Sequence, residues 1–486
     1  MLKPQCHRTL VIAIVAAAAS IGCAARAADA AAPAPSAPLT REEDFRRMLT
    51  LLHLTMPGPL PAMAEDSNRT PTATLQPDGR HWADSAGNGV GRSVWGTWTN
   101  YDEAKANPCP LTDPLRLKSG EEVRDAATWW QQRRPEILGD LQTEIFGKAP
   151  SPTPAVTWEV AKVETETLGG TAILKTVVGH IDNSAYPAAT PRIELKLWIP
   201  AGAAGPVPVM VVVDSGPSVA PNRPAGPPPP PAPGPDAREQ LLALGWGYGT
   251  FATGALQADS GAGLGAGIIG LVNRGRPRQP GDWGALAAWA WGLSRTIDYL
   301  QTDPSVDATR LGVEGHSRWG KTALLAAASD PRWAICYASC SGEGGAKLSR
   351  RNWGETLDDV AGLGEYHWMA GNFLKYAGHW NNLPVDSPEL MALVAPRPLF
   401  VTGGTRDQWA DPHGEFLAAV AAGPVYRLLG RKDLGTTAMP APDDALIAGD
   451  LAFRYHNGGH TDAIDWPVFL QFAARHFQGQ GSAAVR

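Results

Sequence analysis

Cysteine is scarce in this chain of 486 residues, which contains five. Cys6 and Cys23 lie close to the N-terminus, and Cys109, Cys336 and Cys340 remain for the rest of the chain. Three cysteines are too few for a disulfide scaffold, and Cys336 and Cys340 share one predicted extended segment, which would hold them too far apart to bridge. No cysteine or histidine spacing matches a structural zinc site. The scarcity therefore excludes a disulfide framework and a structural zinc fold.

Two other features that would define a class of protein are also missing. The formal net charge is −6, and the lack of a basic excess argues against a nucleic-acid binder. No apolar run reaches the length of a transmembrane helix, so we expect no stable membrane insertion. The hydrophobic fraction of 44% excludes wholesale disorder. The composition therefore indicates a globular protein with one large domain or two to three smaller ones.

Tryptophan, in contrast, is abundant, with 18 copies against 9 tyrosines and 10 phenylalanines. Indole packs well in protein cores and also stacks on sugar rings, so composition leaves both roles open. The 53 glycines and 44 prolines make up about a fifth of the chain and indicate many loops and turns.

The first 30 residues have the pattern of a secretory signal peptide. Lys3 and Arg8 give a positive start, residues 10–19 are apolar, and small-x-small patterns precede residue 30. We therefore expect a secreted or periplasmic protein. An uncleaved anchor is the alternative, and the residues before Cys23 weakly resemble a lipoprotein cleavage site.

The rest of the chain divides into two parts. Residues 31–110 are predicted to be a linker and an N-terminal extension, and residues 111–480 a catalytic domain. Helical spacing predicts helices over residues 42–54, 125–145, 283–300, 319–329 and 469–477. Apolar runs predict strands over residues 209–213, 310–314, 333–338, 398–402 and 425–429. This alternation predicts an α/β fold with a mostly parallel central sheet covered by helices on both faces, and residues 227–231 form a proline-rich exposed loop.

Residues 315–322, between a predicted strand and a predicted helix, read GHSRWGKT and fit two motifs. If the segment is a phosphate-binding loop, its backbone N–H groups would hold phosphate, Lys321 would reach the outer phosphates, and Thr322 would hold magnesium. If the segment is a nucleophile elbow, its sharp turn would present Ser317, and Gly315 and Gly320 would relieve crowding around this serine.

Three observations favour the elbow. A signal peptide would send the protein where ATP is scarce, and the bulky Arg318 and Trp319 do not suit a phosphate cradle. An acid and a histidine also follow Ser317 at predicted strand ends, in the chain order of this type of hydrolase, as Asp407 and His460.

The general base must reach Ser317, because a free serine hydroxyl is a poor nucleophile at neutral pH. Of the 11 histidines, His460 follows a Gly-Gly turn between the last strand and the last helix, where such folds place the base. His456 is the alternative base, and His316 is expected to be structural beside the serine.

Four motifs together resemble the bacterial glucuronoyl esterases of carbohydrate esterase family fifteen, over roughly residues 105–480. They are GHSRWGK at 315–321, SGEGGA at 341–346, DQWADP at 407–412 and GGH at 458–460. The resemblance implies an α/β-hydrolase fold. It also implies cleavage of the ester that joins the glucuronic, or 4-O-methyl-glucuronic, acid of xylan to lignin alcohols.

The sequence departs from many members of this family at one position. Their catalytic acid is a glutamate just before the SGEGGA-like segment, and Cys340 stands there in this chain. A cysteine cannot supply a stable negative charge to an imidazolium. Other bacterial members instead carry an aspartate after the next-but-one strand, and Asp407 matches that position. Glu343 is the second candidate for the acid, and Asp411 is expected to be a turn or helix cap.

The resemblance also implies roles for four further residues. Arg318 matches an arginine that helps to hold the oxyanion, with a structural ion pair as the alternative. Lys321 and Glu355 match residues that bind sugar hydroxyls, although Glu355 could lie on a solvated helix face. Trp409 matches a tryptophan that contacts the uronate, although it could instead serve loop packing.

We therefore predict a serine esterase whose triad is Ser317, His460 and Asp407, acting as a monomer without metal or cofactor. Its expected partner is a glucuronoxylan or lignin-carbohydrate ester, and Trp353 and Trp368 are further candidates for the cleft. The alternatives are an acetyl xylan esterase on the same fold, and a non-catalytic glycan-binding relative that has lost activity with the glutamate.

Overall fold

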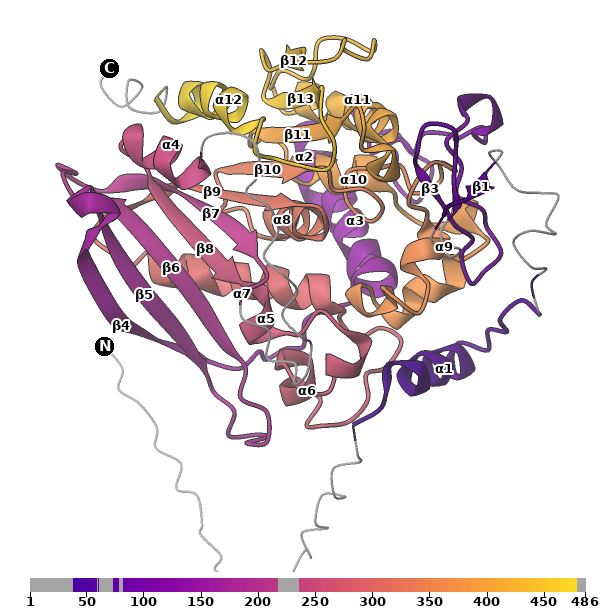
Figure 1. Ribbon diagram of the computed structural model, residues 1–486, viewed down its shortest axis with the longest axis horizontal. Coiled ribbons are helices and arrows are strands. Elements are labelled where there is room, and N and C mark those ends of the chain that lie inside the picture. The colour runs from indigo at the N-terminus through magenta and orange to yellow at the C-terminus, as the bar shows by residue number, and fades with distance from the viewer. Residues whose placement is uncertain (1–37, 59, 61–72, 78–81, 217–235, 479–486) are drawn as a thin grey trace, which may run out of the picture. The chain divides into compact units, whose positions relative to one another are not determined.

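The computed structural model describes residues 38–58, 60, 73–77, 82–216 and 236–478 (Figure 1). The predicted signal peptide and the proline-rich loop at residues 227–231 lie outside the described residues. Among the helices of these described segments, none combines the length and apolar character that crossing a membrane requires.

A ten-stranded sheet runs through the molecule in the order β12-β13-β11-β10-β9-β7-β8-β6-β5-β4 (Figure 1). The six strands from β13 to β8 pair in parallel, and the strands at both edges pair antiparallel. The bounds are β4 (Val156–Thr167), β5 (Ala172–Ile181), β6 (Arg192–Pro200), β7 (Val207–Asp214), β8 (Gly247–Ala252), β9 (Val306–His316), β10 (Ile335–Ser339), β11 (Leu399–Gly404), β12 (Ala445–Leu446) and β13 (Leu451–His456).

Side-chain alternation along these strands builds two cores, one on each face of the sheet. In β11, Val401 belongs to a large core with Leu324 of α8, whereas its neighbour Phe400 belongs to a second core with Phe469 of α12. Successive side chains of a strand point to opposite faces, so both faces are buried. The first face is covered by α7 (Ala285–Leu300), α8 (Arg318–Ser329) and α11 (Pro412–Leu428), and the second by α4 (Ala237–Ala243) and α12 (Trp466–Gln478).

Most predicted elements are confirmed with shifted ends, but the predicted strand at residues 425–429 is wrong. Residues up to Leu428 continue α11, which begins at Pro412 behind the N-cap Asp411. A short apolar run fits a buried helix as well as a strand, and tertiary packing decides between them. The prediction also missed β13, which pairs with β11 and leads to His460.

The remaining helices are short, apart from α1. The predicted helix at residues 125–145 is helical throughout but contains two π-helical stretches, η2 and η3. The bounds are α1 (Arg41–Leu51), α2 (Ala126–Thr128), η2 (Trp129–Arg133), α3 (Arg134–Asp140), η3 (Leu141–Ile145), α5 (Thr253–Leu256), α6 (Ile268–Val272), α9 (Leu357–Val360) and α10 (Ser387–Ala392). Single turns of 3-10 helix are η1 (Glu103–Lys105), η4 (Leu168–Gly170), η5 (Gly261–Gly263), η6 (Tyr366–Trp368), η8 (Trp380–Asn382) and η9 (Gln408–Ala410), and η7 (Gly371–Tyr376) is longer.

The N-terminal extension contains a small antiparallel sheet of β1 (Thr74–Leu75), β2 (Trp82–Ala83) and β3 (Gly89–Val90). Figure 1 shows β1 and β3 beside α9, on the same side of the molecule. The indole N–H of Trp95 donates to the carbonyl of Ala361 at 3.0 Å, and Thr97 donates to Asp358. These contacts attach the extension to the region between β10 and β11.

Candidate active site

Ser317 lies at the sharp turn between β9 and α8. Its backbone has φ 61° and ψ −130°, a conformation that costs a non-glycine residue about 1–3 kcal/mol and that is typical of functional sites. The N–H of Ser317 donates to the carbonyl of Ser339 at 2.9 Å, which ties the turn to the end of β10. The turn therefore has the strained geometry of a nucleophile elbow.

The two glycines of the motif are required by close packing. A Cβ atom at Gly315 would lie 2.0 Å from the carbonyl oxygen of Trp319, and one at Gly320 would lie 2.9 Å from that of Ser339. Neither contact is possible without moving backbone. The prediction that glycine relieves crowding around Ser317 is confirmed.

His460 and Asp407 form a hydrogen-bonded pair next to this turn. The Nδ1 atom of His460 lies 2.7 Å from Oδ2 of Asp407, whose side chain is buried, while His460 is half exposed. The His460 ring also packs against that of His316, the residue before Ser317, with ring centroids 4.3 Å apart. An imidazole held by a carboxylate beside a serine elbow is an arrangement suited to acyl transfer.

Parallel pairing explains why residues so distant in sequence meet here. Within the sheet, β9, β10, β11 and β13 are neighbours, and their carboxyl ends lie at one edge. Ser317 follows β9, Asp407 follows β11 and His460 follows β13. Ligands of open α/β sheets bind at this edge, outside the carboxyl ends of the strands.

The alternative base and acids are all engaged elsewhere. Fully buried His456 binds Asp465 through Nδ1 at 2.8 Å and the carbonyl of Gly459 through Nε2 at 3.0 Å. Glu343 lies 3.4 Å from Lys347, and burial raises the pKa of Glu343 to about 7. The expectation for Asp411 is confirmed, since its side chain caps the N-terminus of α11.

Cys340 lies beside the hydrogen-bonded pair of Asp407 and His460. Its Sγ, a carboxylate oxygen of Asp407 and a ring nitrogen of His460 all lie within 4.8 Å of one another. Burial raises the pKa of the Cys340 thiol well above its usual value, so the thiol is neutral near pH 7. A metal would require the thiolate and would compete with the Asp407–His460 bond, so the donor set fits a metal poorly.

Arg318 is held by a carboxylate that the sequence did not single out. Asp259 accepts hydrogen bonds from Arg318 Nη1 at 2.7 Å, His367 Nε2 at 2.8 Å and Trp368 Nε1 at 2.6 Å. Burial alone would raise the pKa of Asp259, but the bond from His367 and the charge of Arg318 hold it well below its usual value. Asp259 follows α5, 59 residues before Arg318, and no local signal indicated which cation it meets.

Lys321 and Glu355 meet in a buried ion pair. Lys321 Nζ lies 2.9 Å from Glu355 Oε2 and donates to the carbonyl of Ser341 at 2.7 Å. The backbone N–H of Glu355 donates to the carbonyl of Trp409 at 2.8 Å, which joins this pair to the loop that carries Asp407. Because the Lys321 ammonium is paired with a carboxylate, it does not face an open phosphate cradle, and the phosphate-loop interpretation fails on this geometry.

The tryptophan candidates differ in exposure. Trp409 is 39% exposed, so its ring is available to a ligand. Trp368 is buried, with its ring centroid 5.0 Å from Arg318 Cζ and 5.5 Å from Lys321 Nζ, so it supports the two cations. Trp353 is half-buried.

Two titratable groups at the site have strongly shifted pKa values, and one of them, Glu365, was not among the residues predicted from the sequence. Burial, then the charge of Glu355, raises the pKa of Glu365 to about 8, with Lys321 and Arg318 opposing the shift. Burial, then the charge of His460, lowers the pKa of His316 to about 3. Both side chains are therefore neutral at pH 7, and nothing in the local sequence indicates this.

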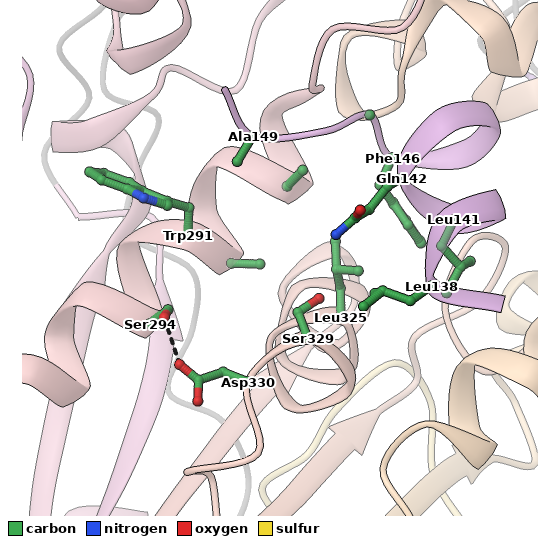
Figure 2. Close-up of a pocket in the computed structure, with 13 residues that line it drawn as sticks. Leu138, Leu141, Gln142, Phe146, Ala149, Trp291, Ser294, Leu325, Ser329 and Asp330 are labelled. Carbon is green, nitrogen blue, oxygen red and sulfur yellow. Dashed lines mark hydrogen bonds between the residues drawn. The ribbon is translucent and has the colours of Figure 1, made fainter. Parts of the chain in front are cut away.

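A mainly apolar, partly open pocket elsewhere in the fold takes no part in this site. Figure 2 shows that it lies among Leu141, Trp291, Leu325 and Asp330, and its volume is about 180 Å³. Asp330 follows the last residue of α8, at the opposite end of this 12-residue helix from Ser317. Leu325 is the lining residue of α8 nearest to Ser317 in the chain, eight positions away, so about 12 Å of helix separates the pocket from the elbow.

Comparison with known proteins agrees with this geometry. Residues 278–430 match the family described as "Glucuronyl esterase, fungi". The chain is 34% identical over 407 residues to carbohydrate esterase MZ0003 from an unknown prokaryotic organism, covering 78% of this chain and 92% of that protein. It is 29% identical to the 4-O-methyl-glucuronoyl methylesterase of Cerrena unicolor, covering 70% of this chain and 65% of that enzyme.

The solved structures extend the same result to three dimensions. The solved structure of a CE15 glucuronoyl esterase from Teredinibacter turnerae T7901 superposes on this chain with a TM-score of 0.76 at 39% identity. That match covers 90% of this chain and all of the other. It confirms the predicted α/β-hydrolase fold with a mostly parallel sheet and helices on both faces. The chain therefore belongs to the glucuronoyl esterases of carbohydrate esterase family 15, which are carboxylic ester hydrolases.

Proposed function

We propose that this esterase cleaves esters between lignin-type alcohols and the glucuronic, or 4-O-methyl-glucuronic, acid of glucuronoxylan, using Ser317, His460 and Asp407. The observation that carries the triad is the 2.7 Å contact of His460 with Asp407 beside the strained turn at Ser317. The name of the Cerrena unicolor relative, a 4-O-methyl-glucuronoyl methylesterase, supports the uronate part of the substrate.

In the first half of the reaction, Ser317 Oγ attacks the ester carbonyl carbon and His460 takes the proton on Nε2. Asp407 accepts the hydrogen bond from Nδ1–H, which fixes the tautomer and stabilises the imidazolium. The bond between the carbonyl carbon and the alcohol oxygen then breaks, and His460 returns the proton to the departing alcohol.

The second half repeats this chemistry with water. His460 removes a proton from the water, whose oxygen attacks the acyl carbon on Ser317. The bond to Ser317 Oγ breaks, the proton returns to this oxygen, and the uronic acid is released, which restores the enzyme; the free acid then loses its carboxyl proton to water. No step of this sequence consumes a cofactor.

The oxyanion of each tetrahedral intermediate meets two kinds of donor. The N–H of Arg318 belongs to the first turn of α8, where N–H groups have no partner inside the helix. The Arg318 guanidinium adds a full positive charge. Because an esterified uronate is neutral, this charge acts mainly on the negative charge that develops during attack, which favours kcat.

The sugar is recognised by Lys321, Glu355 and Trp409. An ion pair can offer ammonium donors and carboxylate acceptors together, and sugar hydroxyls need both. Trp409 offers an exposed indole for the apolar face of the ring. The pattern of residues 1–30 supports secretion, which would place the enzyme, acting as a monomer, among its insoluble polymers.

The purified protein tests this proposal on methyl or benzyl glucuronate and on acetylated xylan, with Ser317→Ala as the inactive control. We expect uronate release that Ser317→Ala abolishes. Acetate release without uronate release would instead show an acetyl xylan esterase. Binding of xylan oligomers without turnover of either substrate would show a non-catalytic relative.

A further inference from the structure

An open cleft of about 1000 Å³ lies between the N-terminal extension and the loop that carries Asp407. The extension contributes Asp84, Asn88 and Tyr101, and Trp353 and Arg406 form part of the opposite wall. The mechanism above assigns no role to these side chains. A cleft of this volume is at the upper end of the roughly 300–1000 Å³ of small-molecule sites, and so accommodates several sugar rings.

The cleft adjoins the reacting groups. Arg406 and Gln408, which both line it, flank Asp407 in the chain, and Trp353 precedes Glu355 by two residues. Tyr101 lies within electrostatic reach of Asp407 and Glu355, as well as of two further acids. A polymer whose uronate side group occupies the site at Ser317 can therefore continue into this cleft.

The wall formed by the extension is held in place by bonds to the catalytic domain. The N–H of Gly354 donates to the carbonyl of Asn100 at 3.0 Å, and Asn100 Nδ2 donates to the carbonyl of Asn352 at 2.9 Å. Glu103 lies 2.6 Å from Arg351. Since both walls are fixed before a ligand arrives, little ordering entropy opposes binding.

The lining suits a neutral, hydroxyl-rich chain. Trp353 and Tyr101 form an edge-to-face aromatic pair with ring centroids 6.3 Å apart. Around them lie hydroxyl and amide groups and charges of both signs, namely Asp84, Ser85, Asn88, Asp102, Glu103, Lys105, Thr405, Arg406 and Gln408. Pyranose rings present apolar faces to aromatic rings and hydroxyls to polar groups, whereas a polyanion would meet three carboxylates.

We propose that this cleft binds neutral sugar residues of the xylan main chain that flank the esterified uronate, an inference that rests on the proposed function. The N-terminal extension is then a part of the substrate-binding surface. It adds affinity for polymeric substrates and none for a small uronate ester.

The test fills the cleft without touching the catalytic groups. Ala86 is exposed and lines the cleft, whereas Ala104 of the same extension is exposed but does not line it. Ala86→Trp and the matched control Ala104→Trp are compared with the wild type. The substrates are methyl glucuronate and a xylo-oligosaccharide that carries one methyl-esterified glucuronate. Binding of an unesterified xylo-oligosaccharide is measured by calorimetry.

We expect Ala86→Trp to lower kcat/KM on the oligosaccharide ester by about tenfold through KM, as the loss of one or two contacts implies. The rate of Ala86→Trp on methyl glucuronate should match that of the wild type. Ala104→Trp should match the wild type on both substrates. The inference is overturned if Ala86→Trp behaves as the wild type on the oligosaccharide. Equal losses on both substrates, or an equal loss in Ala104→Trp, would also overturn it. Benzyl glucuronate is assayed alongside, and a loss on this ester that is absent on methyl glucuronate and on the oligosaccharide would overturn the inference and assign the cleft to the aromatic alcohol.

Calorimetry separates this inference from the proposed function. If no glucuronate ester is turned over, the esterase proposal fails, but the cleft assignment still predicts oligosaccharide binding that Ala86→Trp weakens by about tenfold. If turnover is present and the wild type binds no oligosaccharide, the cleft assignment fails alone.

Discussion

Replacing Asp407 with asparagine tests the assignment of the catalytic acid most directly. The side chain is buried and its Oδ2 lies 2.7 Å from His460 Nδ1. An asparagine has the same shape but carries an NH₂ group, which would donate a hydrogen bond to the lone pair of His460 Nδ1. The histidine proton would then sit on Nε2, where it blocks uptake of the Ser317 proton.

The size of the effect follows from this change of tautomer. In hydrolases with this arrangement, the change lowers kcat by about 10⁴-fold, which corresponds to about 5 kcal/mol of activation free energy. KM should change little, because Asp407 does not contact the sugar in this mechanism. The unfolding midpoint should stay near that of the wild type, since the asparagine is isosteric.

Cys340 provides a second, stricter test. Its Sγ lies within 4.8 Å of both an Asp407 oxygen and a His460 nitrogen, so a longer acidic side chain at this position can reach the imidazole. In an Asp407→Ala background, we expect Cys340→Glu to restore kcat by about ten- to a hundredfold, and Cys340→Gln, of equal shape but no charge, to restore none. Cys340→Ala alone should leave the rate nearly unchanged.

The assay is steady-state hydrolysis of methyl or benzyl glucuronate at pH 7, with thermal unfolding to check each variant. If Asp407→Asn keeps the wild-type rate while Glu343→Gln loses it, the assignment of the acid is refuted. Equal rescue by Cys340→Glu and Cys340→Gln would refute the requirement for a charge.

Three other predictions concern the groups around the oxyanion and the sugar. Asp259→Asn, which frees Arg318, should lower kcat by about tenfold with little change in KM on methyl glucuronate, and a loss carried by KM would contradict the positioning role. Lys321→Met leaves the buried Glu355 charge unpaired and should lower the free energy of unfolding by about 3–5 kcal/mol, measured by denaturant titration. Adding Glu355→Gln should recover part of this loss. Glu365 is neutral below about pH 8 and gains a negative charge above it, which offsets the Arg318 charge. The rate should therefore fall as pH rises through about 8, and Glu365→Gln should keep its rate there; an identical pH profile would contradict this.

The local motifs of this chain could be read from sequence because their physical constraints are local. Gly315 and Gly320 flank Ser317 within six residues, and the tight strand-to-helix turn needs them wherever it occurs. The same holds for β7 and α8, whose apolar patterns differ clearly in period. The order of Ser317, Asp407 and His460 indicated the type of hydrolase before any contact was known.

Two other parts of the fold, residues 425–429 and the N-terminal extension, could not be predicted from sequence patterns. Residues 425–429 have the apolar composition of a strand, but the packing of α11 on β11 and β13 makes them helical. The N-terminal extension looked irregular, because its strands β1, β2 and β3 are two residues each, and it is attached through contacts with distant residues, such as that of Thr97 with Asp358. A sequence pattern carries no signal for a contact with a residue more than 200 positions away.

For the active site, the sequence determined which residue types are present and in what order, whereas the tertiary structure decided how they are paired. Glu343 and Asp407 were both acids of suitable position, and only the parallel pairing of β11 with β13 brings Asp407 to His460. Asp259 reaches Arg318 in the same way, from the loop after α5. The physical reason is that pairing energies depend on distance and burial, which arise when the sheet assembles and have no counterpart in the spacing along the chain.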